Sequence, residues 1–318
     1  MKRRALLGSA LLLPSLARAQ EWAPDRPVRL VVPFAAGTTT DILGRIAANH
    51  LSRGLGQPVV VDNRSGAGGA LGAAAVAQAA PDGLTLLFGT SGTQATNPLL
   101  MKDIQYEPLR DFAPVAACAR TSVILGVRPQ FGAATLAEFV ALAKRRNIAI
   151  GTAGTGTTGH LTQALLDLRA GITTTHVPYR DAGRGLADLL NGTLDSMVYH
   201  PLGFLPHIQA GNVRPLACTG QSRHFLFPDL PTMAEAGVPG VVVEGWWAVY
   251  VPARTPPAVI ARLNALLNAA LADPATRAEL RRQGLETMGG TPEDLAAQTR
   301  AEIDRQREVV QAAGITAG

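Results

Sequence analysis

The fold of this sequence is constrained most by short apolar runs that alternate with amphipathic segments, with only a few residues between them. Apolar runs at 28–34 (VRLVVPF), 57–66 (QPVVVDNRSG) and 84–90 (LTLLFGT) have the composition of strands. Between them, Thr40–Leu51 carries apolar residues on one helical face, and Ala70–Ala80 reads as a helix of small residues. Strand–helix–strand repetition with short loops predicts a parallel sheet covered by helices.

The same alternation starts again in the middle of the chain. A strand runs into the loop GTAGTGTTGH at 151–160, further strands follow at THVPYR and LDSMVYH, and a helix over 183–191 ends at a glycine. The C-terminal third is helical. Because the second set is bracketed by material of the first, the sequence predicts an α/β protein of two domains. The expected boundaries are 20–121 with 221–318 for the first domain and 122–220 for the second.

The N-terminus has the pattern of a secretory signal peptide over residues 1–19. A basic start (Lys2, Arg3 and Arg4) precedes an apolar stretch too short to span a membrane, and Ala17-Arg18-Ala19 has the small-x-small form of a cleavage site. This segment holds four of the 29 Lys and Arg and none of the 24 Asp and Glu, so the remaining chain is near +1. We therefore expect a soluble periplasmic protein, with neither nucleic acid nor a membrane surface as a partner.

The loops after the predicted strands are where an open α/β sheet binds its ligand. Here they are rich in hydroxyls, glycines and free backbone N–H groups, and nearly free of charge, which suits an anion held by dipoles. The alternative, for any one loop, is an ordinary turn with a helix-capping residue. The candidate ligand-binding residues are Phe34, Ala35, Ala36, Gly37, Thr38, Thr39, Thr40, Thr90, Ser91, Thr93, Thr155, Gly156, Thr157, Thr158, Gly159, His160, Tyr179, Arg180 and His200.

The same loops contain no recognisable catalytic or cofactor motif. The 151–160 loop has neither the Lys of a phosphate-binding loop nor the G-x-G-x-x-G spacing. No G-x-S-x-G elbow or pair of carboxylates is present, although Asp41 and two of the loop histidines could act as bases. The histidines lack metal-ligand spacing. The sequence therefore predicts no catalytic residue, no metal and no cofactor, and an enzyme on this fold is the disfavoured alternative.

An ordered series of motifs resembles the Bug-type solute receptors of tripartite tricarboxylate transporters. It begins with VRLVVPFAAGTTTDILGR and GQPVVVDNRSGAGGALGAAAVAQAAPDGLTLLFGT, and continues with GTTGHL, HVPYR, LADLLNGTLDSM, LPHIQAGNVRPLA, FPDLPTMAEAGVPG, PARTPPAVIARLN and GGTPED. The resemblance covers about residues 24–314. It implies a two-domain type II periplasmic binding protein, a clamshell with crossover strands at Pro114–Val127 and Val213–Thr219. It also implies that the loops Phe34–Thr40 and Thr155–His160 hold a ligand carboxylate through N–H groups and waters.

Two departures from the family pattern bear on the ligand. Relatives read PFPPGG where this chain has PFAAGT, and they often have an acidic residue where this chain has Tyr199-His200. We expect His200 to donate to a second carboxylate, more strongly when protonated, so that a dicarboxylate or aromatic acid binds better than an amino acid and more tightly at pH 6 than at pH 8. The alternative is that His200 only caps the loop before Pro201 and does not meet the ligand. Trp246-Trp247 reads as core, although one ring could line the cleft.

The resemblance implies a monomeric receptor that delivers a small organic carboxylate to the membrane components of a tripartite tricarboxylate transporter. Presentation of the closed receptor to a sensor kinase is an alternative that the sequence leaves open. Cys118 and Cys218, the two cysteines, both fall in the expected crossover strands, where a disulfide would need Cα atoms about 4.4–6.8 Å apart. Two buried free thiols are the ordinary alternative.

Overall fold

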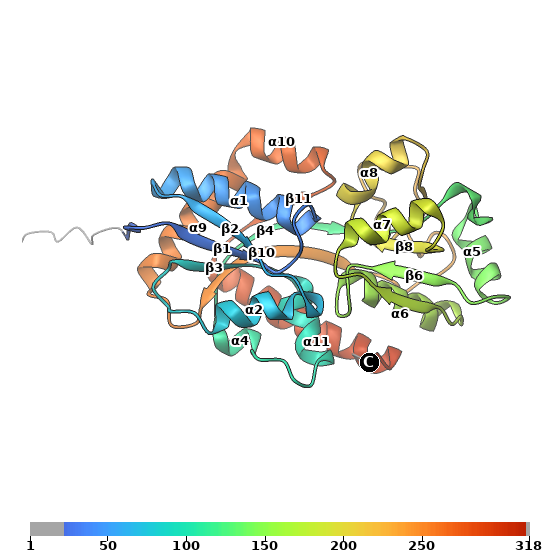
Figure 1. Cartoon of the computed structure of the whole chain (residues 1–318), viewed down its shortest axis with the longest axis horizontal. Helices are drawn as coiled ribbons and strands as arrows, with labels where there is room; N and C mark the ends of the chain where they lie inside the picture. Colours follow the sequence, from blue (N-terminus) through green and yellow to red (C-terminus); the bar gives the residue numbers. More distant parts are fainter. Residues whose placement is uncertain (1–21, 316–318) are drawn as a thin grey trace, which may run out of the picture.

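The computed structural model describes residues 22–315, so the expected signal peptide lies outside the described residues. The chain forms two lobes, each built on its own sheet, and long strands run from one lobe toward the other (Figure 1). The N-terminal segment and the last helices belong to one lobe, and the middle of the chain forms the other. The predicted two-domain α/β architecture is confirmed.

The first lobe has a six-stranded sheet in the order β11-β4-β10-β3-β1-β2. As predicted, β1 lies parallel to β2 and β3, but β10 is antiparallel to β3 and β4. The sheet is therefore mixed. The strands are β1 (Val28–Val32), β2 (Val59–Asn63), β3 (Thr85–Thr90), β4 (Phe112–Ser122), β10 (Glu244–Pro252) and β11 (Glu286–Gly289). The helices are α1 (Thr39–Leu55), η1 (Ala67–Gly69), α2 (Ala70–Ala77), η2 (Gly92–Thr96), α3 (Asn97–Leu100), α4 (Pro108–Asp111), α9 (Pro257–Ala272), α10 (Pro274–Arg282) and α11 (Pro292–Ala313).

The second lobe has a five-stranded sheet in the order β7-β6-β8-β5-β9. The parallel pairs of β6 with β7 and β8 follow the strand–helix alternation, whereas β5 is antiparallel to both of its neighbours. The strands are β5 (Ile124–Val127), β6 (Ala149–Thr152), β7 (Thr175–Pro178), β8 (Ser196–Tyr199) and β9 (Arg214–Cys218). The helices are η3 (Pro129–Phe131), α5 (Leu136–Ala143), α6 (Thr158–Ala170), α7 (Ala182–Asn191) and α8 (Pro201–Gln209).

The two lobes are joined by crossings of the chain, one of which differs from the prediction. The outward crossing is where we expected it, because β4 of the first sheet continues through Val123 into β5 of the second. The return crossing is not at Val213–Thr219. That segment forms β9, which pairs with β5 inside the second sheet. The chain returns later, into β10, whose first residues pair antiparallel with the end of β4.

The packing of residues 220–243 also bears on the domain boundary. Met233, Val238, Val241 and Val243 are buried in the core of the second lobe, together with residues of β5, α5 and α6. We therefore propose that the second domain extends to about Val243, beyond the limit expected from the sequence.

The two cysteines are buried and free. Cys218 pairs with Ile124 in the second sheet, whereas Cys118 lies six residues earlier along the same outward crossing. At about 3.3 Å per residue, this places the thiols roughly 20 Å apart, which is far beyond disulfide reach. The cysteines are far apart because the chain returns to the first lobe only after Cys218, so Cys218 lies in the second sheet and not in a crossover strand beside Cys118.

Across residues 22–315, no helix combines the length and the apolar character needed to span a membrane.

Candidate functional site

A cavity lies between the lobes, where the carboxyl ends of strands from both sheets meet. Its walls come from the β1–α1 loop and the β3–η2 turn of the first lobe, the starts of α6 and α8 in the second, and β10. The lining residues are Phe34, Thr38, Thr39, Thr40, Thr90, Ser91, Gly92, Ala153, Thr157, Thr158, Gly159, Val198, Tyr199, His200, Gly245, Trp246 and Trp247. None of these side chains belongs to Asp, Glu, Lys or Arg.

The first wall is the N-terminus of α1. Thr38 caps this helix by accepting from the Asp41 N–H at 3.4 Å, and its hydroxyl donates to the Ala35 carbonyl at 2.8 Å. Helical geometry leaves the first-turn N–H groups of Thr39 and Thr40 without partners in the helix. The positive end of the helix therefore faces the cavity.

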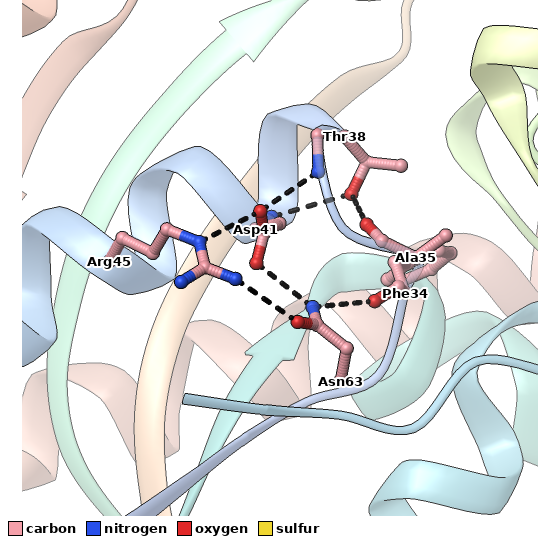
Figure 2. Close-up of polar contacts among 7 residues, drawn as sticks. Phe34, Ala35, Thr38, Asp41, Arg45 and Asn63 are labelled. Atoms are coloured by element: carbon pink, nitrogen blue, oxygen red, sulfur yellow. Dashed lines mark hydrogen bonds and ion pairs between the residues drawn. The ribbon is translucent and has the colours of Figure 1, made fainter. Parts of the chain in front are cut away.

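A buried carboxylate holds the loop in front of this helix (Figure 2). Asp41 accepts from the Gly37 N–H at 2.8 Å, the Asn63 amide at 2.9 Å and Arg45 Nε at 3.0 Å, and Asn63 also donates to the Phe34 carbonyl at 3.0 Å. Burial raises the pKa of Asp41, but the hydrogen bonds from Arg45, Gly37 and Asn63 together outweigh it and leave the pKa below its ordinary value. Asp41 is thus a charged support for the loop, and its bond to Gly37 occupies the N–H that we expected to face the ligand.

The second wall, at the start of α6, repeats this arrangement from the other lobe. The hydroxyl of Thr157, the residue before the helix, donates to the Gly154 carbonyl at 2.7 Å, so no side chain caps α6. The first-turn N–H groups of Thr158 and Gly159 have no partner within the helix. The Gly156 N–H, in contrast, donates to His160 Nδ1 at 3.2 Å. Gly37 and Gly156 have φ of +80° and +79°, and each is tied to a side chain four residues further on.

Two histidines support the second loop from behind. The His160 and His176 rings are stacked with centroids 4.0 Å apart, and His176 Nε2 lies 2.7 Å from the Thr152 hydroxyl. Burial lowers the pKa of each ring to about 4. His160 is therefore neutral near pH 7, with Nδ1 as an acceptor, and it does not line the cavity.

The predicted site residues fall into three groups. Those in the cavity wall are Phe34, Thr38, Thr39, Thr40, Thr90, Ser91, Thr157, Thr158, Gly159 and His200. Thr155, Tyr179 and Arg180 line an adjoining cavity at the mouth of the cleft. Outside both linings are Ala35, Ala36, Gly37, Thr93, Gly156 and His160. Thr93 is fully buried. Its hydroxyl accepts from the Thr90 N–H at 2.9 Å, which stabilises the turn after β3.

Sequence reasoning missed most of the contribution of β10. Both Trp246 and Trp247 line the cavity, although successive residues of a strand ordinarily face opposite sides. The ladder between β10 and β4 shifts register just after Trp247. Trp247 Nε1 donates to the Thr40 hydroxyl at 2.9 Å, which ties the strand to the start of α1. The tryptophan pair was visible in the sequence, but its position depends on the return crossing.

Tyr199 reaches toward the first lobe from the end of β8. Burial raises the pKa of its phenol, whereas the hydroxyl and N–H of Thr39 act in the opposite direction. The Tyr199 hydroxyl therefore faces the start of α1 across the cavity.

Two buried polar atoms of the wall have no hydrogen-bond partner within residues 22–315: His200 Nδ1 and Trp246 Nε1. The other ring nitrogen of His200 lies 3.4 Å from the Thr158 hydroxyl, and its ring is 4.9 Å from that of Trp247. Burial lowers the pKa of His200 to about 4. The ring is therefore neutral at both pH 6 and pH 8, and the expected change in its protonation between these values is wrong.

The described part of the chain holds no cluster of three or more His, Cys, Asp or Glu side chains suited to a metal ion. A cavity walled by helix N-termini and hydroxyls, without a charged side chain, is suited to holding a small anion by dipoles.

Two sheets joined by crossing strands around such a cavity define a two-lobed solute-binding protein. The sequence of residues 43–315 matches the family model described as the tripartite tricarboxylate transporter family receptor. The chain belongs to this family. Protein BugT of Bordetella pertussis is 36% identical over 294 residues, which cover 92% of this chain and 90% of BugT.

Solved structures agree with this assignment. Rpa4515 of R. palustris, solved with adipate, superposes with a TM-score of 0.89 at 38% identity, covering 92% of this chain and 99% of that one. MatC (Rpa3494) from Rhodopseudomonas palustris, solved with bound malate, gives a TM-score of 0.86 at 34% identity, covering 90% and 99%. The family is one of periplasmic solute receptors that work with tripartite transporters.

Proposed function

We propose that this protein is a periplasmic receptor that binds a small organic carboxylate between its lobes and delivers it to the membrane components of a tripartite tricarboxylate transporter. The observation that carries the proposal is the convergence of two helix starts, α1 from one lobe and α6 from the other, whose first-turn N–H groups face a cavity without charged side chains. Each helix start offers N–H groups and a partial positive charge to an anion. Related receptors solved with adipate and malate support the same ligand class.

The proposed binding geometry follows from the unpartnered atoms of the wall. The carboxylate accepts from the first-turn N–H groups of α1 and α6, directly or through water. Trp246 Nε1 can only donate, and neutral His200 donates through Nδ1 in one tautomer. Phe34 and Tyr199 add aromatic surface for the carbon skeleton. An ammonium group would find no carboxylate in this wall, which favours a dicarboxylate or an aromatic acid over an amino acid.

Export by the predicted signal peptide places the receptor in the periplasm, where it acts as a monomer. Because both lobes supply parts of the site, binding draws them together, and the closed form is the one presented to the transporter.

The experiment that tests this function is native mass spectrometry of the purified protein, before and after denaturation and refolding. We expect a small acid to be released by denaturation, and the same acid to bind again as one molecule per chain with its mass unchanged on incubation. Conversion of the bound acid into a product would instead identify an enzyme. Failure of the refolded protein to bind any organic acid would contradict the proposal.

A further inference from the structure

A second cavity adjoins the first at the mouth of the cleft. It lies between the η1 segment of the first lobe and the loops that follow β6 and β7 of the second. We call it the outer cavity, and the one walled by the helix starts the inner cavity. Phe34 and Ala153 line both cavities, so these two residues form the boundary between them.

The two lobes are in close contact through glycine backbone in the lining of the outer cavity. A Cβ atom on Gly68, which has φ of +56°, would lie 2.1 Å from the Thr155 carbonyl oxygen of the other lobe. Gly66 and Gly69 also have positive φ, and the neighbouring Ala67 is the only non-glycine residue with positive φ in the described chain. Main chain from both lobes therefore forms this part of the cavity wall, and a residue larger than glycine there would push the lobes apart.

The outer cavity differs from the inner one in having a charge. Arg180, two residues beyond the end of β7, is the one charged residue in its lining. Its guanidinium donates to the Ser65 carbonyl of the opposite lobe at 3.4 Å, and within residues 22–315 it has no carboxylate at ion-pair distance. A long, exposed bond to a neutral carbonyl is weaker than a charge-assisted bond to a carboxylate. Arg180 is thus a cation at the cleft mouth that an anionic ligand group would engage better than its present partner does.

We propose that the outer cavity is a second carboxylate site and that Arg180 selects unbranched dicarboxylates by length. This inference rests on the proposed function, because it takes one carboxylate to be held in the inner cavity. The carbon chain then passes Phe34 and Ala153, and the second carboxylate replaces the Ser65 carbonyl as the acceptor of Arg180. Acids too short to reach Arg180 bind through the inner cavity alone.

The test is calorimetric titration of the refolded full-length mature protein with the unbranched dicarboxylates from succinate to pimelate, and with butyrate as a monocarboxylate. In the wild type, affinity should rise with length until the second carboxylate reaches Arg180. Arg180→Gln should weaken binding of the longer diacids about tenfold, change butyrate binding by less than about twofold, and remove the length preference. Arg180→Lys should restore part of the preference, since it keeps the charge.

Arg184→Gln is the matched control, because Arg184 lies four residues further on, is largely exposed and pairs with Asp188 at 4.0 Å. It should leave all affinities unchanged. Equal weakening of long and short acids in Arg180→Gln, or unchanged binding of the long diacids, would overturn the outer site while leaving the receptor function in place. If no acid binds the wild type, the proposed function fails and this inference fails with it.

Discussion

Replacement of Trp246 by phenylalanine should affect ligand binding and stability in different directions. Trp246 Nε1 is buried in the cavity wall without a hydrogen-bond partner in residues 22–315. An unpartnered buried donor costs about 1–3 kcal/mol, and Trp246→Phe removes that cost from the empty protein. The smaller phenyl ring leaves a void that destabilises the folded protein by about 1 kcal/mol. The free energy of unfolding of the ligand-free protein should therefore stay the same or rise by up to about 2 kcal/mol.

The affinity of Trp246→Phe for the ligand should fall. If the indole donates to the ligand carboxylate, the variant loses a charge-assisted hydrogen bond worth about 1.5–3 kcal/mol. This corresponds to a loss of affinity of roughly 10- to 150-fold. The assay is calorimetric titration with the acid that the wild type binds, combined with denaturant unfolding of the empty proteins.

Trp247→Phe is the matched control on the neighbouring residue. Trp247 Nε1 already donates to the Thr40 hydroxyl at 2.9 Å, so this variant loses a satisfied bond as well as ring volume. It should destabilise the empty protein by about 1–3 kcal/mol. Unchanged affinity in Trp246→Phe would refute the role of the indole, and a large loss of stability would refute the reasoning about its missing partner.

Three further changes have expected outcomes. In Gly156→Ala, the added Cβ would lie 2.0 Å from Asn97 Oδ1 of the other lobe. Small-angle scattering should therefore show a more open protein and calorimetry at least a tenfold loss of affinity, and an unchanged radius of gyration would contradict this. Asp41→Ala removes the acceptor of the Gly37 N–H. Provided that the variant still unfolds cooperatively, calorimetric titration should show an affinity about tenfold lower, and full affinity would exclude a positioning role for Asp41. The pKa of His200 is about 4 in the folded protein against about 6.5 in the unfolded chain, so the unfolded chain binds more protons between these values. Stability should fall as pH drops from 6.5 to 4, and His200→Gln should remove up to about 3 kcal/mol of that fall, with His160 and His176 accounting for further loss. Affinity should be flat between pH 6 and pH 8.

The repeating pattern of the sequence predicts the strands and helices that carry most of the cavity wall. The apolar run before Phe34 and the helix after it are both where the periodicity places them, because a strand buried on both faces and an amphipathic helix have distinct patterns. The return crossing could not be located in this way. Both Val213–Thr219 and the segment around Trp246 are short apolar runs, and only pairing with β5 or β4 distinguishes them.

The sequence pattern also did not predict where the N–H groups of these glycines point. Gly37 and Gly156 supply the turns that we expected, but their N–H groups point to Asp41 and His160 and leave the ligand to the helix starts behind them. The equal spacing of four residues in both loops was a pattern in the sequence that could have indicated this. The pKa of His200 depends on its burial against Trp247, which no local pattern reports.

The central claim is that the inner cavity binds a carboxylate through dipoles, without a charged side chain. Calorimetric titration of the refolded protein with a dicarboxylic acid, its diamide and the corresponding α-amino acid tests it most directly, since the three share a carbon skeleton. We expect the acid to bind at least about 100-fold more tightly than the diamide, because only the acid presents a negative charge to the two helix starts, and more tightly than the amino acid, whose ammonium has no partner. Equal affinity for the diamide, or a preference for the amino acid, would contradict the account.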